Sequence, residues 1–253
     1  RRIVAIGDLH GDIKSALRVL QMAGVANRKG KWIGGDNTIL VQTGDLIDRG
    51  PDTNRMLELL PDLVKSANKV GGRVIQILGN HEVMNLAGNL RYVRESEKEF
   101  SSELDRAKAF DLLGRFGKRL SNLPVVYRVG DTVFAHGGIT PEWAESNMYQ
   151  TNQYAKTQLK KYVADKKQNQ RVMAPAILGN EGPLWYRGYV YDPEEAACAI
   201  LQRALDAMGA KRMVVGHTVQ DDGHILSRCR ERFFVIDVGI SKAIRGHQAA
   251  LEI

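Results

Sequence analysis

The chain has 253 residues, of which 43% are hydrophobic and 26% charged, and its formal net charge is +7 at pH 7. This composition excludes a disordered or membrane-spanning protein and is typical of a single globular domain, which we expect to occupy residues 1–253. Aromatic residues do not alternate with basic clusters, so we expect no nucleic-acid partner. The chain begins with Arg1 and shows no signal-peptide pattern, so the sequence assigns no compartment.

Short apolar runs rich in β-branched residues recur along the chain and predict buried strands. The first five lie at residues 3–6, 38–41, 74–78, 132–135 and 212–215. Four other runs, at residues 125–128, 224–228, 233–237 and 248–253, predict a second sheet behind the first. We therefore expect an α/β fold with a central mixed β-sandwich flanked by helices.

Three helices are predicted between these strands. Residues 12–24 carry apolar side chains at helical spacing and end at a glycine, so this helix should pack on the first strand. Residues 52–70 are also helical, but Pro61 should divide them into two short helices. Asp192 caps a third helix, which continues with a proline and two acids and ends at Gly209.

Two segments without strand patterns interrupt this alternation. Residues 95–120 and 141–186 are predicted as helical insertions that lie over the rim of the fold and shape access to it. The second insertion carries a basic face formed by Lys160, Lys161, Lys166, Lys167 and Arg171. We interpret it as a solvated helix face, with docking of an acidic phosphoprotein segment as the alternative.

Polar side chains of metal-binding type follow each of the first five predicted strands. The motifs are Gly7-Asp8-Leu9-His10, Gly44-Asp45 with Asp48-Arg49, Gly79-Asn80-His81, His136-Gly137 and Gly216-His217. Because the ligand crevice of an open α/β sheet lies beyond the carboxyl ends of its strands, these side chains should meet at one rim. Each motif alone is common in turns that follow strands, but the occurrence of all five in this order predicts a metal site.

The ligand types agree with two divalent cations. Asp8 and His10 are two residues apart in an extended segment, so both side chains point the same way. Asp45 has two carboxylate oxygens with which it would bridge two ions, an arrangement suited to phosphate ester hydrolysis. Mixed nitrogen and oxygen ligands without a thiolate favour manganese, iron or zinc, and the ligand types do not decide among them. Our expectation is manganese, with iron or zinc as alternatives.

These motifs resemble those of the phosphoprotein phosphatases, metal-dependent enzymes with the calcineurin-like metallophosphoesterase fold. The run Gly79-Asn80-His81-Glu82-Val83-Met84-Asn85-Leu86, followed by Arg91-Tyr92-Val93, is similar to the Shewanella-like, bacterial-type branch. The resemblance covers the chain from residue 1 to about residue 239. It implies one metal held by Asp8, His10 and Asp45, and a second held by Asp45, Asn80, His136 and His217.

The resemblance also implies the catalytic roles. His81 would be the general acid, oriented by Asp48, because an imidazole held by a carboxylate can protonate a leaving alkoxide near neutral pH. Arg49, Arg187 and Asn80 would bind the substrate phosphate, and paired guanidinium groups suit a tetrahedral oxyanion. The implied reaction is direct attack of a metal-bridging hydroxide on a phosphomonoester, without a covalent phosphoenzyme.

The chain departs from the eukaryotic serine/threonine phosphatases after His217. Their tyrosine- and cysteine-bearing loop over the active site is replaced by Ile236-Asp237-Val238-Gly239-Ile240-Ser241. The preference among phosphoserine, phosphothreonine and phosphotyrosine therefore stays open. Phosphoproteins are the expected partners of a monomeric enzyme, and a regulatory protein partner stays open.

Two other functions compete with this prediction. Symmetrical dinucleoside tetraphosphatases share the metal motifs, so hydrolysis of small phosphoanhydrides is the nearer alternative. A non-catalytic binding or scaffold protein is the second, and the complete set of ligands together with His81 argues against it.

Two cysteines, Cys198 and Cys229, are present. Nothing in their spacing pairs them, so we expect no disulfide. Cys198 is expected to be a small buried apolar residue on one face of a helix.

Overall fold

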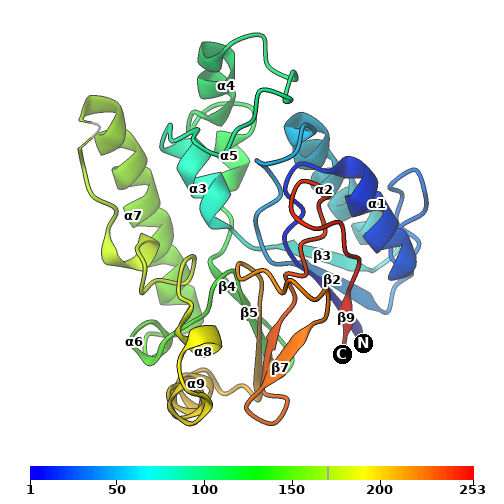
Figure 1. The fold of residues 1–253 in the computed structure, drawn as a ribbon, viewed down its shortest axis with the longest axis vertical. Helices are drawn as coiled ribbons and strands as arrows, with labels where there is room; N and C mark the ends of the chain where they lie inside the picture. Colours follow the sequence, from blue (N-terminus) through cyan, green and yellow to red (C-terminus); the bar gives the residue numbers. More distant parts are fainter. Residues whose placement is uncertain (170) are drawn as a thin grey trace.

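Two β-sheets pack against each other in the centre of the molecule, and helices cover their outer faces (Figure 1). The computed structural model describes residues 1–169 and 171–253, so Gln170, within the predicted second insertion, lies outside the described residues. The strand order is β3-β2-β1-β9 in the first sheet and β4-β5-β6-β8-β7 in the second. The predicted α/β sandwich is confirmed.

The first sheet is built on three parallel strands. These are β1 (Arg2–Ile6), β2 (Thr38–Gln42) and β3 (Arg73–Gln76), and the short β9 (Leu251–Glu252) runs antiparallel to β1. Helices α1 (Ile13–Met22) and α2 (Thr53–Asn68) cover its outer face (Figure 1). Pairing of the first and last strands places the two chain ends side by side.

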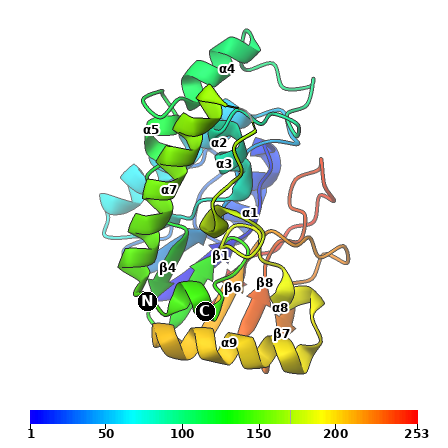
Figure 2. The same ribbon diagram turned by 90° about the vertical axis from the view of Figure 1, so that its left-hand side faces the viewer.

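The second sheet also has a parallel centre. Its strands are β4 (Val126–Val129), β5 (Thr132–Ala135), β6 (Arg212–Val215), β7 (Leu226–Arg228) and β8 (Phe233–Val235). Strands β5, β6 and β8 run parallel, whereas β4 and β7 are antiparallel edges. Helices α6 (Pro141–Ala144), α8 (Gly188–Tyr191) and α9 (Glu194–Met208) lie on its outer side (Figure 2).

Alternation of side chains explains why the central strands are apolar throughout. Val4 and Ile6 pack under the helices, while Ala5 joins Phe134 and Val214 in the core between the sheets. A strand buried on both faces needs apolar residues at successive positions, which is the pattern seen in the sequence.

The pairing of the predicted strands is only partly as expected. Strands β4, β7 and β8 lie in a second sheet, but they share it with β5 and β6, which were expected in the first. The last strand, β9, pairs with β1 instead of joining the second sheet. Periodicity indicates that a strand is buried, but packing of distant segments decides which strand lies beside it.

Helix α2 is continuous, so the predicted break at Pro61 is wrong. Pro61 has no backbone N–H, and the carbonyl of Leu57 one turn earlier therefore loses its helical partner. The guanidinium group of Arg119 donates to this carbonyl at 3.1 Å. This contact from a distant segment replaces the missing hydrogen bond.

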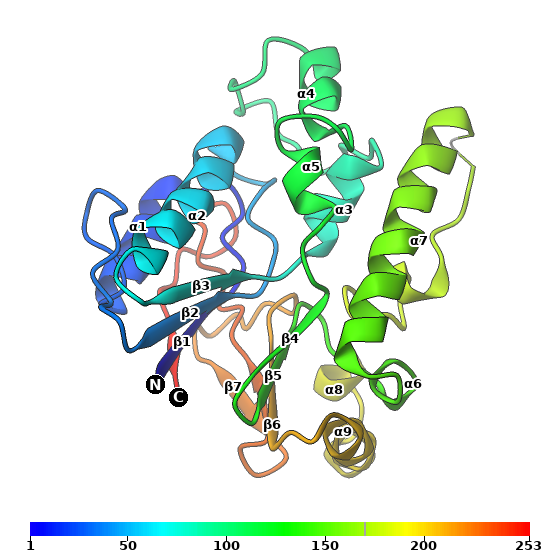
Figure 3. The same ribbon diagram turned by 180° about the vertical axis from the view of Figure 1, so that it is seen from behind.

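The two predicted insertions supply helices on one side of the sheets. Helices α4 (Glu103–Phe110) and α5 (Gly117–Leu120) follow α3 (Asn80–Leu86), and α7 (Met148–Gln168) and the 3-10 turn η1 (Ala176–Leu178) lie in the second insertion (Figure 3). On the basic face of α7, Lys161 pairs with Asp165 at 2.6 Å and Lys167 pairs with Asp111. These ion pairs favour the solvated helix face. No helix in the described part of the chain is long and apolar enough to cross a membrane.

Cys198 and Cys229 form a disulfide, with their Cα atoms 5.4 Å apart, so the expectation of unpaired cysteines is wrong. Cys198 lies on α9, whose N-cap is Pro193 and not the predicted Asp192, and whose C-cap is Gly209 in the left-handed conformation, as predicted. Cys229 follows β7, and packing of α9 beside the β7–β8 turn brings the two sulfurs together. The spacing of the two cysteines along the sequence does not indicate that these two segments pack together.

We expect loss of this disulfide to destabilise the protein. A cross-link over a sequence separation of 31 residues restricts the unfolded chain, and its removal typically costs about 2–4 kcal/mol. Urea unfolding with and without a reductant measures the difference, and Cys198→Ala/Cys229→Ala is the control that should no longer respond to the reductant. An unchanged midpoint after reduction would contradict the prediction.

Candidate active site

The predicted metal ligands come together where the parallel strands of both sheets end. Asp8 and His10 follow β1, Asp45 follows β2, and Asn80 begins α3 after β3. His136 directly follows β5, and His217 lies two residues beyond β6. All six are buried, with exposed fractions of 7% or less. The sequence therefore identified a real cluster, although its strands belong to two sheets.

Asp45 lies at the centre of this cluster. Its Oδ2 atom is 3.3 Å from His136 Nε2, 3.7 Å from His81 Nε2 and 3.9 Å from His10 Nε2. Asp8 approaches from one side, with 3.8 Å between its Oδ2 and His10 Nε2. Burial alone would raise the pKa of Asp45, but the surrounding imidazoles hold it well below its usual range.

Two imidazoles are oriented by backbone carbonyls. The Nδ1 atom of His136 lies 2.8 Å from the carbonyl of Thr43, and that of His10 lies 3.1 Å from the carbonyl of Ile47. A carbonyl only accepts, so each Nδ1 carries a proton and each Nε2 is turned toward the cluster, where that of His136 lies 2.8 Å from Asn80 Oδ1. This second contact is the usual way in which proteins orient histidine ligands of metals.

Several residues around the cluster have the left-handed backbone conformation, which is unfavourable for residues other than glycine. Positive φ angles occur at His10 (40°), Asp45 (57°), Asp48 (67°), Arg49 (67°) and His217 (66°). Such strain persists only where surrounding contacts hold it, and it is common at active sites. One such contact is Glu82, whose buried carboxylate accepts the N–H groups of Asp45, Leu46 and Gly79 at 2.8–2.9 Å.

The ligand set fits two divalent cations. His10, Asp45 and His81 form one group of possible ligands and Asp45, His136 and His217 form another, with ligand atoms within 4.8 Å of one another in each. His217 Nε2 is buried without a hydrogen-bond partner among the described residues. The pKa of Asp8 is raised by burial and by the neighbouring acids Asp237 and Asp45. Such an excess of buried carboxylates is expected where bound cations would neutralise them.

His81 and Asp48 form a buried pair beside the cluster. His81 Nδ1 lies 2.8 Å from Asp48 Oδ2, and its Nε2 faces Asp45. Burial would lower the pKa of His81, but the charges of Asp45 and Asp48 outweigh it and raise this pKa. The arrangement presents an imidazole that carries a proton toward the cluster.

Asp48 is itself held by residues that the sequence analysis did not select. Asn85 Nδ2 donates to both of its carboxylate oxygens at 3.0 Å, and Arg106 Nη2 donates to Oδ1 at 3.2 Å. Arg106 is 3% exposed and comes from α4 in the first insertion. The sequence carried no signal for it, because a charged residue on a polar helix is predicted to be solvated.

Two arginines lie beside the cluster. Arg187 Nη1 donates to the carbonyl of His217 at 3.0 Å and to Thr218 Oγ1 at 2.9 Å. The guanidinium carbon of Arg49 lies 4.0 Å from the ring centroid of Tyr92, whose ring is also 4.9 Å from that of His81. Tyr92 belongs to a motif noted in the sequence, but its place between Arg49 and His81 was not predicted.

Comparison with known proteins agrees with this geometry. The family model for calcineurin-like phosphoesterases matches residues 1–221. The chain belongs to this phosphoesterase family. It is 36% identical to Shewanella-like protein phosphatase 1 of Plasmodium berghei, over 95% of this chain and 67% of that protein. It is 32% identical to Shewanella-like protein phosphatase 2 of Arabidopsis thaliana, over 95% of this chain and 72% of that protein.

One solved structure and one relative that matches a shorter part of the chain are also similar. The cold-active protein-tyrosine phosphatase of a psychrophilic Shewanella species matches with a TM-score of 0.86 and 27% identity, over 100% of this chain and 75% of that one. The symmetrical bis(5'-nucleosyl)-tetraphosphatase of Proteus mirabilis is 31% identical, but over only 54% of this chain and 45% of that protein. The resemblance to Shewanella-like phosphatases is thus confirmed.

Asp237 is a further acid in the site of this phosphoesterase. It is 1% exposed, follows the end of β8, and its Oδ2 has no hydrogen-bond partner among the described residues. Burial raises its pKa to about 6, and the charge of Asp45 acts in the same direction. Asp8 and Asp45 each follow a strand and come directly after a glycine, whereas Asp237 follows a strand with a glycine two residues later, so the sequence carried only part of the same signal here.

We expect Asp237→Asn to stabilise the metal-free phosphoesterase at high pH. An acid with a raised pKa in the folded state favours folding at low pH, and this contribution is lost as the pH rises through about 6. The variant should therefore gain about 2–3 kcal/mol at pH 8 and little at pH 4. Urea unfolding of both chelated proteins at the two pH values tests this, and an equal difference at both would contradict it.

Proposed function

We propose that the protein is a metal-dependent phosphoprotein phosphatase that hydrolyses phosphomonoesters of serine and threonine, and of tyrosine as well. The observation that carries the proposal is the buried pair of His81 and Asp48 beside the ligand cluster. An alkoxide leaving group needs a proton as the P–O bond breaks, whereas the phosphate leaving group of an anhydride depends on it far less. A placed acid therefore favours phosphomonoesters.

The cluster is proposed to hold two divalent cations, with manganese as first choice and iron or zinc as alternatives. Asp8, His10 and Asp45 would bind one, and Asp45, Asn80, His136 and His217 the other. When bound, such a pair supplies positive charge near the phosphoryl oxygens and an activated water nucleophile at neutral pH.

The remaining steps are assigned to the side chains of this chain. Arg49 and Arg187 would bind the phosphoryl oxygens together with Asn80, in the bidentate geometry that guanidinium groups favour. His81 would donate its Nε2 proton to the leaving oxygen, and Asp48 keeps the other ring proton on Nδ1. Attack is direct, so no side chain is needed as a covalent nucleophile.

The organisation of the enzyme is proposed as follows. Residues 1–253 would form one catalytic domain, with residues 95–120 and 141–186 as helical insertions. Phosphoproteins would be its substrates and the enzyme would act as a monomer, without a nucleic-acid partner. Arg106 already gives the first insertion a part in the site, because it holds Asp48.

The test is a comparison of substrates with the manganese-loaded enzyme. We expect kcat/KM on a panel of phosphoserine, phosphothreonine and phosphotyrosine peptides to exceed kcat/KM on diadenosine tetraphosphate by at least about tenfold, since a general acid contributes that much or more to alkoxide departure. Faster turnover of the tetraphosphate would favour the phosphoanhydride hydrolase. Absence of turnover on every substrate would favour a scaffold protein.

A further inference from the structure

A second strained turn lies far from the metal cluster. Within residues 1–169 and 171–253, non-glycine residues with positive φ occur at the cluster and at one other place, the consecutive residues Cys229 (57°), Arg230 (56°) and Glu231 (61°). We call residues 229–232, between β7 and β8, the arginine turn. Three successive left-handed residues are unfavourable and persist only where other contacts hold them.

The arginine turn is firmly attached to α9. The disulfide joins Cys229 to Cys198 on this helix, and the N–H of Cys229 donates to Glu194 Oε1 at 3.0 Å. The N–H of Arg232 closes the turn on the carbonyl of Arg228 at 3.3 Å. The side chains of Arg230 and Arg232 are therefore presented by a rigid backbone.

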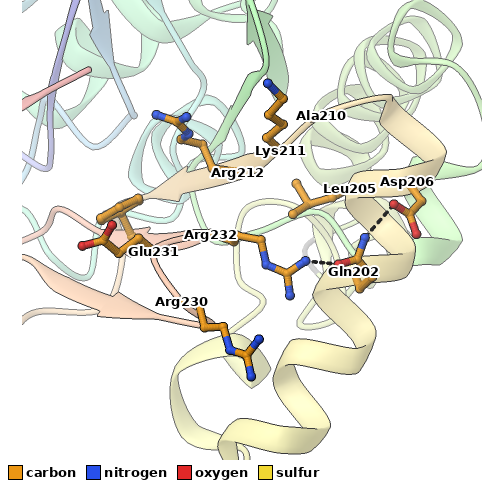
Figure 4. Close-up of a pocket in the computed structure, with 10 residues that line it drawn as sticks. Gln202, Leu205, Asp206, Ala210, Lys211, Arg212, Arg230, Glu231 and Arg232 are labelled. Carbon is orange, nitrogen blue, oxygen red and sulfur yellow. Dashed lines mark hydrogen bonds between the residues drawn. The ribbon is translucent and has the colours of Figure 1, made fainter.

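These side chains line a recess of about 580 Å³ between the arginine turn, α9 and the start of β6. Figure 4 shows Arg230 and Arg232 directed toward α9, while Glu231 points away from them. Lys211 and Arg212 line the recess where β6 begins, but their side chains are directed away from Arg230 and Arg232 and pair with Asp131. We call this space the α9 recess.

The charge of Arg230 and Arg232 is not neutralised by acids of the recess. Arg232 donates to Gln202 Oε1, and the amide of Gln202 in turn donates to Asp206 at 2.6 Å, so a neutral group separates Arg232 from this acid. Arg230 makes no hydrogen bond or ion pair with any described residue. Two guanidinium groups that face one space without a carboxylate between them form a ready site for a tetrahedral oxyanion.

We propose that the α9 recess binds a phosphate group on a protein substrate, at a phosphorylated residue other than the one being hydrolysed. This inference rests on the proposed phosphoprotein phosphatase function. Arg230 and Arg232 bind the phosphate oxygens, whereas Lys211 and Arg212 at the edge are paired with Asp131 and are not assigned as ligands. The recess thus selects substrates that carry phosphates at two positions.

The distance between the α9 recess and the metal cluster determines which ligands could bind to both sites at once. Arg212 is the first residue of β6, and His217 follows its end, so the two sites lie at opposite ends of the strand. Five residues of strand span roughly 16 Å, so a ligand in the recess does not touch the reacting phosphate. A peptide needs more than about five extended residues between its phosphates to reach both.

Binding is tested first, without hydrolysis. The probe is a fluorescein-labelled peptide that carries one non-hydrolysable phosphonate analogue of phosphoserine, and every protein compared also carries Arg49→Ala, which weakens binding of the probe at the active site. We expect fluorescence polarisation to show at least about tenfold weaker binding to Arg230→Ala/Arg232→Ala, since hydrogen bonds to a charged group are lost. Arg203→Ala, an exposed arginine of α9 outside the recess, is the matched control and should bind like the wild type.

Catalysis is tested with a peptide that carries one phosphoserine and, twelve residues away, the same phosphonate analogue. Against a matched peptide with serine at the second position, the wild type should show a KM about tenfold lower, and the double variant should lose this advantage. Activity on p-nitrophenyl phosphate should be unchanged in the double variant. Arg230→Ala alone, which removes no hydrogen bond among the described residues, should show part of the same loss with an unchanged unfolding midpoint, whereas Arg232 also holds the turn through Cys229 and Gln202. The lysine variant Arg230→Lys/Arg232→Lys should be intermediate, because it keeps charge without the guanidinium geometry.

The outcomes separate this proposal from the proposed function. Equal KM values for the two peptides, or an advantage that survives the double alanine change, overturn the recess proposal while the phosphatase function stands. If inorganic phosphate displaces the labelled peptide completely at equal concentration, the recess binds free phosphate. This result would also overturn the recess proposal. Hydrolysis of p-nitrophenyl phosphate with no hydrolysis of either peptide would overturn the proposed function and the recess proposal together.

Discussion

Replacing Asp45 by asparagine is expected to cost more activity than the loss of any ligand that serves one cation. Asp45 belongs to both groups of ligand atoms in the cluster, whereas His10 and His217 each belong to one. Asparagine keeps the shape but removes the charge that would hold both ions. We expect kcat/KM to fall by more than about a hundredfold, beyond the loss usual for changes outside the ligand sphere.

Metal content measured by mass spectrometry makes this prediction specific. Chelation should abolish turnover of the wild type and manganese should restore it, while Asp45→Asn should recover neither metal nor activity. His10→Asn and His217→Asn are the matched single-group variants and should keep more metal. Full activity in a chelated sample, or equal losses in all three variants, would contradict a shared Asp45.

Replacing His81 by asparagine is expected to slow hydrolysis of phosphoserine peptides by roughly a hundredfold or more, the usual contribution of a general acid. The loss should be smaller on p-nitrophenyl phosphate, because nitrophenolate leaves without protonation. The physical basis is the 2.8 Å contact between His81 Nδ1 and Asp48, which directs Nε2 toward the site.

Metal content also separates two roles for His81. Its ring lies with His10 and Asp45 in a group that could hold an ion, so the geometry alone also allows it to act as a ligand. As a general acid it should be replaceable with nearly full metal content. Loss of metal from His81→Asn, or an equal loss of rate on good and poor leaving groups, would show that it does not act as the acid.

The candidate ligands were predictable because each has a local signal. A buried strand ends on an acid, an asparagine or a histidine beside a glycine, as at Asp8, Asp45 and His217. At Gly79 and Gly216 a Cβ atom would lie 2.2–2.3 Å from a carboxylate oxygen of Asp45 or Asp8. Glycine is therefore required where the backbone approaches the acids, and this requirement is visible in the sequence.

The residues that support the site were not predictable in the same way. Arg106 lies on a helix from the first insertion, far along the chain from Asp48. Tyr92 lies in a loop, and its ring packs in space between the side chains of Arg49 and His81. Arg106 has no local pattern that distinguishes it from a solvated arginine, and the motif that contains Tyr92 does not show which side chains its ring contacts. Only the tertiary structure shows that both side chains lie against the residues of the site.

By itself, the sequence determined the α/β class, the buried strands and the side chains available for metal and phosphate chemistry, because these depend on short periodic patterns. The tertiary structure decided that β9 pairs with β1, that Pro61 lies within a continuous helix and that Cys198 bonds to Cys229. Each of these depends on contact between segments far apart in the chain. Such contacts are selected by packing of the whole fold, which local pattern does not encode.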